Sequence, residues 1–269
     1  MPGKTLGIVV AMDAELVHLL RAYPAKTTTE VDGWPFHHLE IGRREVIALR
    51  SGMGLINAAA GTERLFAEYR PGAILNFGCS GAHRPYIMPG DLILAERVVH
   101  HSAMRILADG REVYTGFGYE TGGEKMDAAE LATDPAWLAA AKNLAATFQP
   151  ETWPVAAGWL EAMPHRKPVM HVGAVASADI WTQAIDRLDV LHARHQPLCE
   201  DMEAAAVAQI AARHGVPFFS VKDISNNEYL KASDLDAFSD FPVAEIGKRA
   251  AAFLAALVEQ MADEKGAGS

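Results

Sequence analysis

Six short, mainly apolar segments recur along the chain, and they constrain its fold more than any other feature. They are rich in Val, Ile and Phe, and they lack the alternation of apolar and polar residues that marks a strand with one face in water. Continuous runs of this kind are typical of parallel strands that are buried on both faces. The predicted strands are Leu6–Ala11, Val46–Leu49, Ala73–Phe77, Asp91–Ala95, Val169–Ala176 and Pro217–Ile224.

Segments with helical periodicity lie between these strands. They are Ala14–Ala22, Ile56–Tyr69, Ala128–Phe148, Thr182–Arg194, Met202–His214 and Ala244–Met261. Strands that alternate with helices predict an α/β fold whose sheet is covered by helices on both faces. Nothing in the sequence resembles an interdomain linker, so we expect one domain over residues 1–269.

Residues 105–167 interrupt the regular alternation. The Gly-rich, polar stretch 105–125 predicts either a long loop or flap, or an ordinary hairpin with surface turns, and the residues do not decide between them. Residues 152–167 carry prolines and show no clear period. We therefore expect an insertion or flap near 105–167.

The charge balance and the cysteine content exclude several classes of protein. The formal net charge is −10 and no block of Lys or Arg stands out, so we expect neither a nucleic-acid partner nor a membrane partner. No apolar run approaches the ~20 residues that a membrane-spanning helix requires, and no signal-peptide cleavage site is visible. Cys79 and Cys199 are the only cysteines, which suits a reducing compartment. We expect a cytoplasmic protein.

Small and polar residues follow most of the predicted strands. In open α/β sheets, ligands bind at the carboxyl ends of the strands, so these residues are candidates for a binding site. Gly78 and Gly81 bracket a turn that lets backbone N–H groups approach a ligand, although a simple strand-to-helix turn has the same pattern. The candidate segments are 12–15 (MDAE), 51–54 (SGMG), 78–81 (GCSG), 177–179 (SAD) and 225–227 (SNN).

Motifs for several other chemistries are missing from the sequence. It contains no GxGxxG dinucleotide motif, no GxxxxGK[ST] phosphate loop, no HExxH metal motif and no GxSxG nucleophile elbow. The pairs His37-His38 and His100-His101 would point to opposite faces of a strand, and we interpret them as structural or surface residues. We expect no metal site.

The acidic residues are more informative. Glu200, Asp201 and Glu203 precede an apolar helix, and acids in a first helical turn are usually caps or favourable charges at the helix dipole. This interpretation suits Glu200 and Asp201. Glu203 differs because an almost wholly apolar helix follows it, and a buried acid needs a partner. Asp13 and Glu15 are either helix-start residues or carboxylates that bind sugar hydroxyls or orient water as a general base.

Taken in order, these segments resemble the nucleoside phosphorylase/nucleosidase superfamily, and within it most closely the 5′-methylthioadenosine/S-adenosylhomocysteine nucleosidases. The similarity covers about residues 6–260, and its motifs are GIVVAMDAELVHLL, SGMGLINAAAGTERL, NFGCSGA, PGDLILAERVVHH, VASADIW and EDMEAAAVAQIAARHGVPFFSVKDIS. The resemblance implies a three-layer α/β/α sandwich around a mixed, mostly parallel sheet. It also implies cleavage of a purine–ribose N-glycosidic bond through a ribooxocarbenium-like transition state, without a metal or organic cofactor, and a role in purine salvage.

The resemblance also implies catalytic residues. Glu15 matches the glutamate that activates water in the family, and Glu203 matches the glutamate that binds the ribose hydroxyls. Lys222 stands where the family has an arginine that helps to hold the water, and Cys79 stands where it has a serine.

Further residues of the family's binding pocket have counterparts here. Trp181 occupies the place of a phenylalanine that stacks on the base, and Thr182 would supply backbone hydrogen bonds to the purine edge. Met202 matches a methionine that packs on the sugar. The remaining predicted binding residues are Met12 and Met53, next to the 5′-substituent, and Ser80 and Gly81 in the glycine turn.

Asn226 departs from the nucleosidase pattern. The nucleosidases end this strand in ISD, with the aspartate as the general acid at purine N7, whereas this chain has ISN. An amide cannot give up a proton as a carboxylic acid can, but it can hydrogen-bond N7 and O6. Asparagine does so in the phosphorylases of 6-oxopurines, so Asn226 favours a 6-oxopurine substrate. Asp223 is an alternative acid, but it would face away from Asn226 on the strand.

The resemblance also bears on the nucleophile. The phosphorylases place an arginine just before the glycine turn to grip phosphate, and here that position is Asn76. Glu15 would repel phosphate, so we expect hydrolysis of a purine nucleoside. The alternatives are a purine nucleoside phosphorylase and a non-catalytic nucleoside-binding protein. Because relatives complete the pocket with residues of a neighbouring subunit, we expect a homodimer by analogy.

Overall fold

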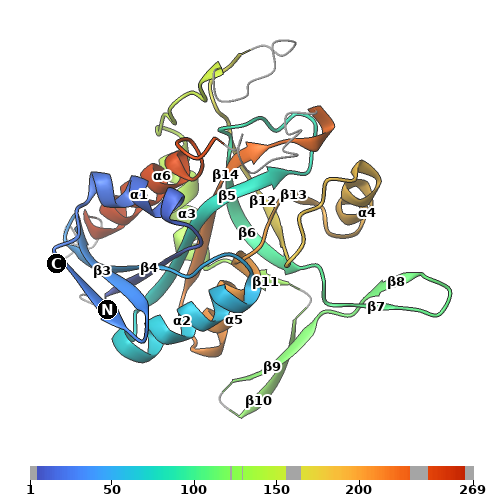
Figure 1. Ribbon diagram of the computed structural model, residues 1–269, viewed down its shortest axis with the longest axis horizontal. Helices are drawn as coiled ribbons and strands as arrows, with labels where there is room; N and C mark the ends of the chain where they lie inside the picture. Colours follow the sequence, from blue (N-terminus) through green and yellow to red (C-terminus); the bar gives the residue numbers. More distant parts are fainter. Residues whose placement is uncertain (1–4, 122, 129, 156–164, 231–241, 264–269) are drawn as a thin grey trace.

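The computed structural model describes residues 5–121, 123–128, 130–155, 165–230 and 242–263 (Figure 1). Within them, ten strands form one mixed sheet in the order β11-β6-β12-β13-β5-β1-β4-β3-β2, and β14 pairs with both β5 and β6. The strands of this sheet are β1 (Leu6–Val10), β2 (Thr27–Val31), β3 (Trp34–Ile41), β4 (Arg44–Arg50), β5 (Ala73–Ala82), β6 (Leu92–His100), β11 (Leu131–Ala132), β12 (Met170–Ser177), β13 (Pro197–Asp201) and β14 (Phe218–Asn226).

Helices cover both faces of this sheet (Figure 1). The apolar core on one face includes Leu16 of α1, Trp137 of α3 and Phe253 of α6. The core on the other face includes Leu65 of α2 and Val207 of α5. The predicted α/β/α sandwich with a mixed sheet is therefore confirmed. The helices are α1 (Asp13–Ala22), α2 (Leu55–Tyr69), α3 (Pro135–Ala145), α4 (Ile185–His195), α5 (Ala204–Arg213) and α6 (Lys248–Asp263).

Strand β14 closes part of the sheet into a ring. It runs parallel to β5 and antiparallel to β6, and the order β5-β13-β12-β6 completes the circle. Every residue of β14 is buried. Because both edges of β14 are paired and both faces are covered, its first residues are mainly apolar, and its polar residues need partners within the protein.

Two hairpins occupy the first half of the predicted insertion and project away from the sheet (Figure 1). They are β7 (Met104–Ile106) with β8 (Glu112–Tyr114), and β9 (Phe117–Thr121) with β10 (Glu124–Ala128). Of the two alternatives for residues 105–125, the hairpin is therefore the correct one. Residues 156–164 of the predicted insertion lie outside the described residues.

The predicted helix from Ala128 begins later than expected. Ala128 belongs to β10, and α3 begins at Pro135. The Asp134 side chain accepts hydrogen bonds from the backbone N–H groups of Ala136 and Trp137, which makes it the N-cap. In the described part of the chain, no helix combines the length and the apolar character that crossing a membrane requires.

Candidate active site

A cavity of about 420 Å³ opens beside the ends of β1, β5, β13 and β14. Every predicted site residue except Lys222 lines it, which brings together segments from across the chain. These residues are Met12, Glu15, Met53, Cys79, Ser80, Gly81, Trp181, Thr182, Met202, Glu203 and Asn226.

Glu15 lies in the first turn of α1, where its carboxylate is buried and held by two backbone donors. Met12 N donates to Oε2 at 3.1 Å, and Cys79 N donates to Oε1 at 2.7 Å. A Cβ at Gly78 would lie 2.8 Å from Glu15 Oε1, so glycine is required for this close approach. Burial raises the pKa of Glu15, although the Cys79 N–H opposes this effect. A carboxyl group whose pKa is shifted toward neutrality is suited to general base catalysis.

Glu203 stands at the N-terminus of α5 and faces the same cavity. Its Oε1 accepts a hydrogen bond from Gly54 N at 2.9 Å. Burial, with the negative charge of Asp201, raises the pKa of Glu203 to about 7. Gly54 has a φ of 93°, and a Cβ there would lie 2.7 Å from Asp179 Oδ1, so a side chain at this turn is excluded.

Lys222 lies beneath the cavity wall. Its Nζ is 2.6 Å from Asp201 Oδ2, and it is absent from the described residues that line the cavity. The role of Lys222 in holding water stays a prediction, and in the structure its positive charge lowers the pKa values of the cavity residues Glu15 and Glu203. Burial alone would lower the pKa of Lys222, but Asp201 and Glu203 outweigh burial and raise it. Asp223 accepts a hydrogen bond from Arg249 N at 2.9 Å, so it faces away from the cavity as predicted.

Asn226 lies at the end of β14, where a β-bulge at Ser225 shifts the register. Ser225 Oγ donates to Asn226 Oδ1 at 2.9 Å, and Asn226 Nδ2 donates to Glu228 Oε1 at 3.1 Å. These contacts orient the amide, and among the described residues no acceptor takes its second N–H. The neighbouring Asn227 has a structural role, because its Nδ2 donates to two main-chain carbonyls.

Glu200 lines the cavity, and its interpretation as a helix cap was wrong. Glu200 and Asp201 belong to β13, and α5 begins only at Ala204. Asp201 does act as a cap, since its Oδ2 accepts from Ala204 N at 2.9 Å. Glu200 instead accepts hydrogen bonds from the backbone N and the Oγ1 of Thr182, each at 2.9 Å. The Thr182 N–H that was predicted to bind a purine is thus used within the protein.

Two buried histidines accompany Glu200. His101 Nε2 lies 2.9 Å from Glu200 Oε1, and His83 Nε2 lies 3.8 Å from Oε2. His101, interpreted from the sequence as structural or surface, is therefore in contact with a cavity residue. Burial opposes ionisation of Glu200, but the two histidines prevail and lower its pKa to about 2. His37 and His38 instead contact threonine hydroxyls outside the cavity, as expected for a surface pair.

The described residues that line the cavity include several carboxyl groups, which do not favour the binding of a phosphate anion. No arginine or lysine occurs among the described residues that line it. Asn76, at the position of the phosphorylase arginine, is locked in the core, because its Nδ2 donates to Val9 O and its Oδ1 accepts from Ser220 Oγ. The described residues also contain no group of three or more His, Cys, Asp or Glu side chains that could hold a metal ion.

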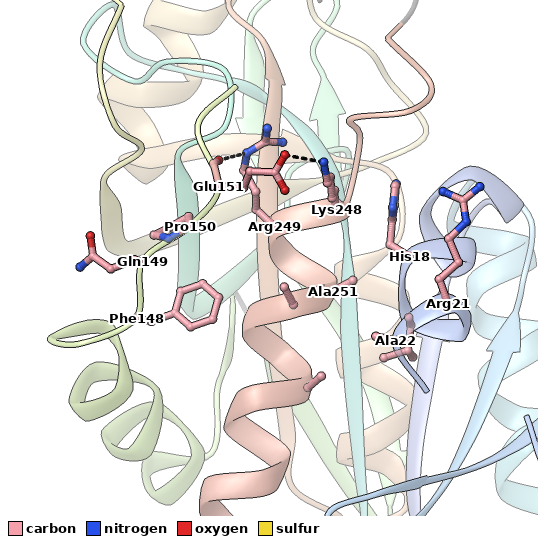
Figure 2. Close-up of a pocket in the computed structure, with 13 residues that line it drawn as sticks. His18, Arg21, Ala22, Phe148, Gln149, Pro150, Glu151, Lys248, Arg249 and Ala251 are labelled. Carbon is pink, nitrogen blue, oxygen red and sulfur yellow. Dashed lines mark hydrogen bonds and ion pairs between the residues drawn. The ribbon is translucent and has the colours of Figure 1, made fainter. Parts of the chain in front are cut away.

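A second cavity, of about 470 Å³, lies between α1, α6 and the segment after α3 (Figure 2). It is lined in part by His18, Lys248 and Arg249, and no predicted site residue reaches it. Lys248 Nζ is 2.7 Å from Glu151 Oε1, and Arg249 Nε donates to the Glu151 carbonyl. Because these two cations are already engaged by the protein, the first cavity is the better candidate for the active site.

The fold is an α/β/α sandwich, and its candidate site is a cavity lined by the buried acids Glu15, Glu200, Asp201 and Glu203. The chain belongs to the phosphorylase superfamily, whose sequence profile matches residues 5–262. It is 28% identical over 260 residues to a 5′-methylthioadenosine/S-adenosylhomocysteine nucleosidase of Shewanella piezotolerans, covering 95% of this chain and 99% of that protein. The predicted family resemblance is therefore confirmed.

Solved structures agree with this assignment. The S-adenosylhomocysteine nucleosidase of Streptococcus pyogenes, in complex with 5-methylthiotubericidin, is 26% identical with a TM-score of 0.74, covering 97% of this chain and 98% of that one. The futalosine hydrolase of Helicobacter pylori is 21% identical with a TM-score of 0.74, covering 96% and 98% of the two chains. At this lower identity the likeness concerns the fold alone.

Proposed function

We propose that this protein hydrolyses the N-glycosidic bond of a purine nucleoside and prefers 6-oxopurine bases. The observation that carries the proposal is the placement of Glu15, a buried carboxylate held by two backbone N–H groups in the cavity that Glu203 also faces. The similarity to 5′-methylthioadenosine/S-adenosylhomocysteine nucleosidases over nearly the whole chain supports the same reaction class.

Glu15 acts on the water molecule that attacks the sugar, and Glu203 binds the sugar's hydroxyl groups. Glu15 orients a water molecule and takes its proton as the water oxygen bonds to the anomeric carbon. Glu203 accepts hydrogen bonds from the ribose hydroxyls, and Met202 packs on the sugar. As the glycosidic bond breaks, its electron pair leaves with the base, and the sugar passes through a ribooxocarbenium-like state. Met12 and Met53 provide an apolar wall for the 5′-substituent.

Water is favoured over phosphate as the nucleophile. Four buried carboxyl groups, those of Glu15, Glu200, Asp201 and Glu203, line the cavity and would disfavour binding of a phosphate dianion. Phosphate sites in proteins rely on arginine or on helix N-termini for binding, and no cation lines the described part of this cavity.

The orientation of Asn226 supports a 6-oxopurine base. Ser225 Oγ–H occupies Oδ1 and Glu228 takes one N–H, which leaves the second N–H of this cavity residue for a ligand. A donor at this place can pair with N7 of any purine, but only a 6-oxopurine also offers an acceptor at position 6, because the 6-amino group of adenine is itself a donor. The 6-oxopurine leaves as an anion that solvent then protonates, so a proton-donating side chain is not required.

The proposal is tested by incubating the protein with inosine, guanosine, adenosine and 5′-methylthioadenosine, with and without phosphate, and measuring free base. We expect release that does not depend on phosphate and is fastest with inosine or guanosine. Release only in the presence of phosphate would establish a phosphorylase instead. Tight nucleoside binding without release would establish a binding protein.

A further inference from the structure

Glu200 and Asn226 flank Gly81 from the two strands that neighbour β5. The register pairs Gly81 with Glu200 of β13 on one side and with Asn226 of β14 on the other. Directly paired residues of neighbouring strands project to the same face, and all three residues line the cavity. Two strand spacings separate the flanking backbones by about 10 Å.

Because Gly81 has no side chain, the space over it between Glu200 and Asn226 is open, and we call this space the slot. A Cβ at Gly81 would lie 3.2 Å from Asn226 Nδ2, so any side chain there would crowd the amide. Without one, a flat ring can lie over the backbone of β5 with Asn226 at one edge and Glu200 at the other. Trp181 lines the same cavity and is half-exposed, and an aromatic ring in such a place can stack on a flat ligand.

The Glu200 carboxylate is held as a fixed, ionised acceptor. Thr182 donates to both of its oxygens, and His101 approaches Oε1 at 2.9 Å. The pKa of about 2 keeps the group charged at neutral pH, because His101 and His83 outweigh its burial. An ionised carboxylate only accepts hydrogen bonds, and its two oxygens offer more acceptor positions than these contacts use.

His83 indicates that a ligand group belongs beside Glu200. Its side chain is 1% exposed and lines the cavity, and within the described residues neither of its ring nitrogens has a hydrogen-bond partner. The 3.8 Å from His83 Nε2 to Glu200 Oε2 is longer than a hydrogen bond. Buried polar groups almost always have hydrogen-bond partners. The polar edge of a bound ligand would supply such partners to both His83 and Glu200.

We propose that Glu200, assisted by His83, recognises the edge of the base opposite Asn226 and selects bases that carry an N–H donor there, as 6-oxopurines do at N1. This inference rests on the proposed cleavage of purine nucleosides. In adenine the ring nitrogen N1 is unprotonated, so its lone pair would face the carboxylate. A site built around a buried hydrogen-bonding group rejects analogues that leave that group unpaired.

Methylation of N1 tests the inference on the unaltered protein. We expect kcat/KM for 1-methylinosine to be at least ~10-fold below that for inosine, since a buried charged acceptor loses its donor. In Glu200→Gln, where the acceptor is neutral, the inosine/1-methylinosine ratio should fall by about 5-fold or more. Glu63→Gln, on the exposed surface of α2, is the matched control and should keep the native ratio. Equal cleavage of both nucleosides by the native protein, or an unchanged ratio in Glu200→Gln, would overturn the inference.

Binding of the free base separates this inference from the proposed hydrolysis. If no nucleoside is cleaved, the hydrolase proposal fails, and calorimetry with hypoxanthine and 1-methylhypoxanthine still decides whether the slot recognises N1–H. The same titration on the native protein serves if Glu200→Gln does not fold. Tighter binding of hypoxanthine by at least ~10-fold supports the inference, and equal affinities contradict it.

Discussion

Lys222 Nζ lies 2.6 Å from Asp201 Oδ2, and each side chain is only 1% exposed. This buried ion pair joins β14 to β13 directly beneath the cavity. Its positive charge lowers the pKa values of both Glu15 and Glu203, which burial raises. The positive charge of Lys222 therefore partly offsets the charges of the buried acids at the cavity.

Removal of Lys222 should be strongly destabilising. Lys222→Met leaves Asp201 buried and unpaired, which costs about 3–5 kcal/mol of unfolding free energy. Urea unfolding at neutral pH measures the change. Lys26→Met, which breaks an exposed pair with Glu40, is the control and should cost less than ~1 kcal/mol. Similar losses in the two variants would show that the buried pair has no special role.

Glu203 should make the stability of the protein depend on pH. Its pKa is raised from 4.5 to about 7 in the fold, so the unfolded chain releases this proton at lower pH than the folded chain does. The contribution of Glu203 to stability therefore falls as pH rises from about 4.5 to about 7. We expect Glu203→Gln to lose less stability than the native protein between about pH 5 and pH 8, measured by urea unfolding.

Some pH dependence will remain in Glu203→Gln, because burial also raises the pKa of Asp223 to about 7. The variant should be more stable than the native protein at about pH 8, while its affinity for nucleosides falls. An identical pH profile for the two proteins would contradict the assignment of this slope to Glu203.

Glu15→Gln should abolish most turnover and leave nucleoside binding intact. The amide keeps the shape of the side chain but cannot take a proton from water, and general base catalysis contributes about 10²–10⁴-fold to rate. Initial rates of base release measure turnover, and calorimetry with the substrate measures binding. Turnover within a few fold of the native rate would refute the role of Glu15.

Asn226→Asp should shift the base preference toward 6-aminopurines. A protonated aspartate can donate a proton to N7, which a neutral adenine leaving group requires and an amide cannot supply. The ratio of kcat/KM for adenosine to that for inosine should rise, and the rise should be larger at lower pH. An unchanged ratio would count against Asn226 as the residue that contacts the base.

The strands that the sequence predicted are those whose burial is continuous. β1 and the first residues of β5 and β14 read as mainly apolar runs because both of their faces are covered. The polar segment Thr27–Val31 forms the edge strand β2 and is mostly exposed, so it gave no such signal. Ala128–Phe148 is rich in alanine and suggested a long helix, although Asp134 and Pro135 carried the true start signal.

The site residues were predictable only where a family pattern placed them. Glu15, Glu203 and Asn226 follow strand ends or begin helices, so their positions could be matched to motifs. Glu200 could not be assigned in this way, because its contact with His101 joins residues 99 positions apart (200 − 101). An acid before an alanine-rich helix is usually a cap, and only the pairing of the short strand β13 with β5 shows otherwise.

The identity of the sugar product tests the central claim most directly. The protein is incubated with inosine in phosphate buffer, and the products are followed by phosphorus NMR together with an assay for free reducing sugar. We predict one free ribose for each hypoxanthine released and no sugar phosphate, because water is the nucleophile that Glu15 activates. Formation of ribose 1-phosphate in step with hypoxanthine would contradict hydrolysis.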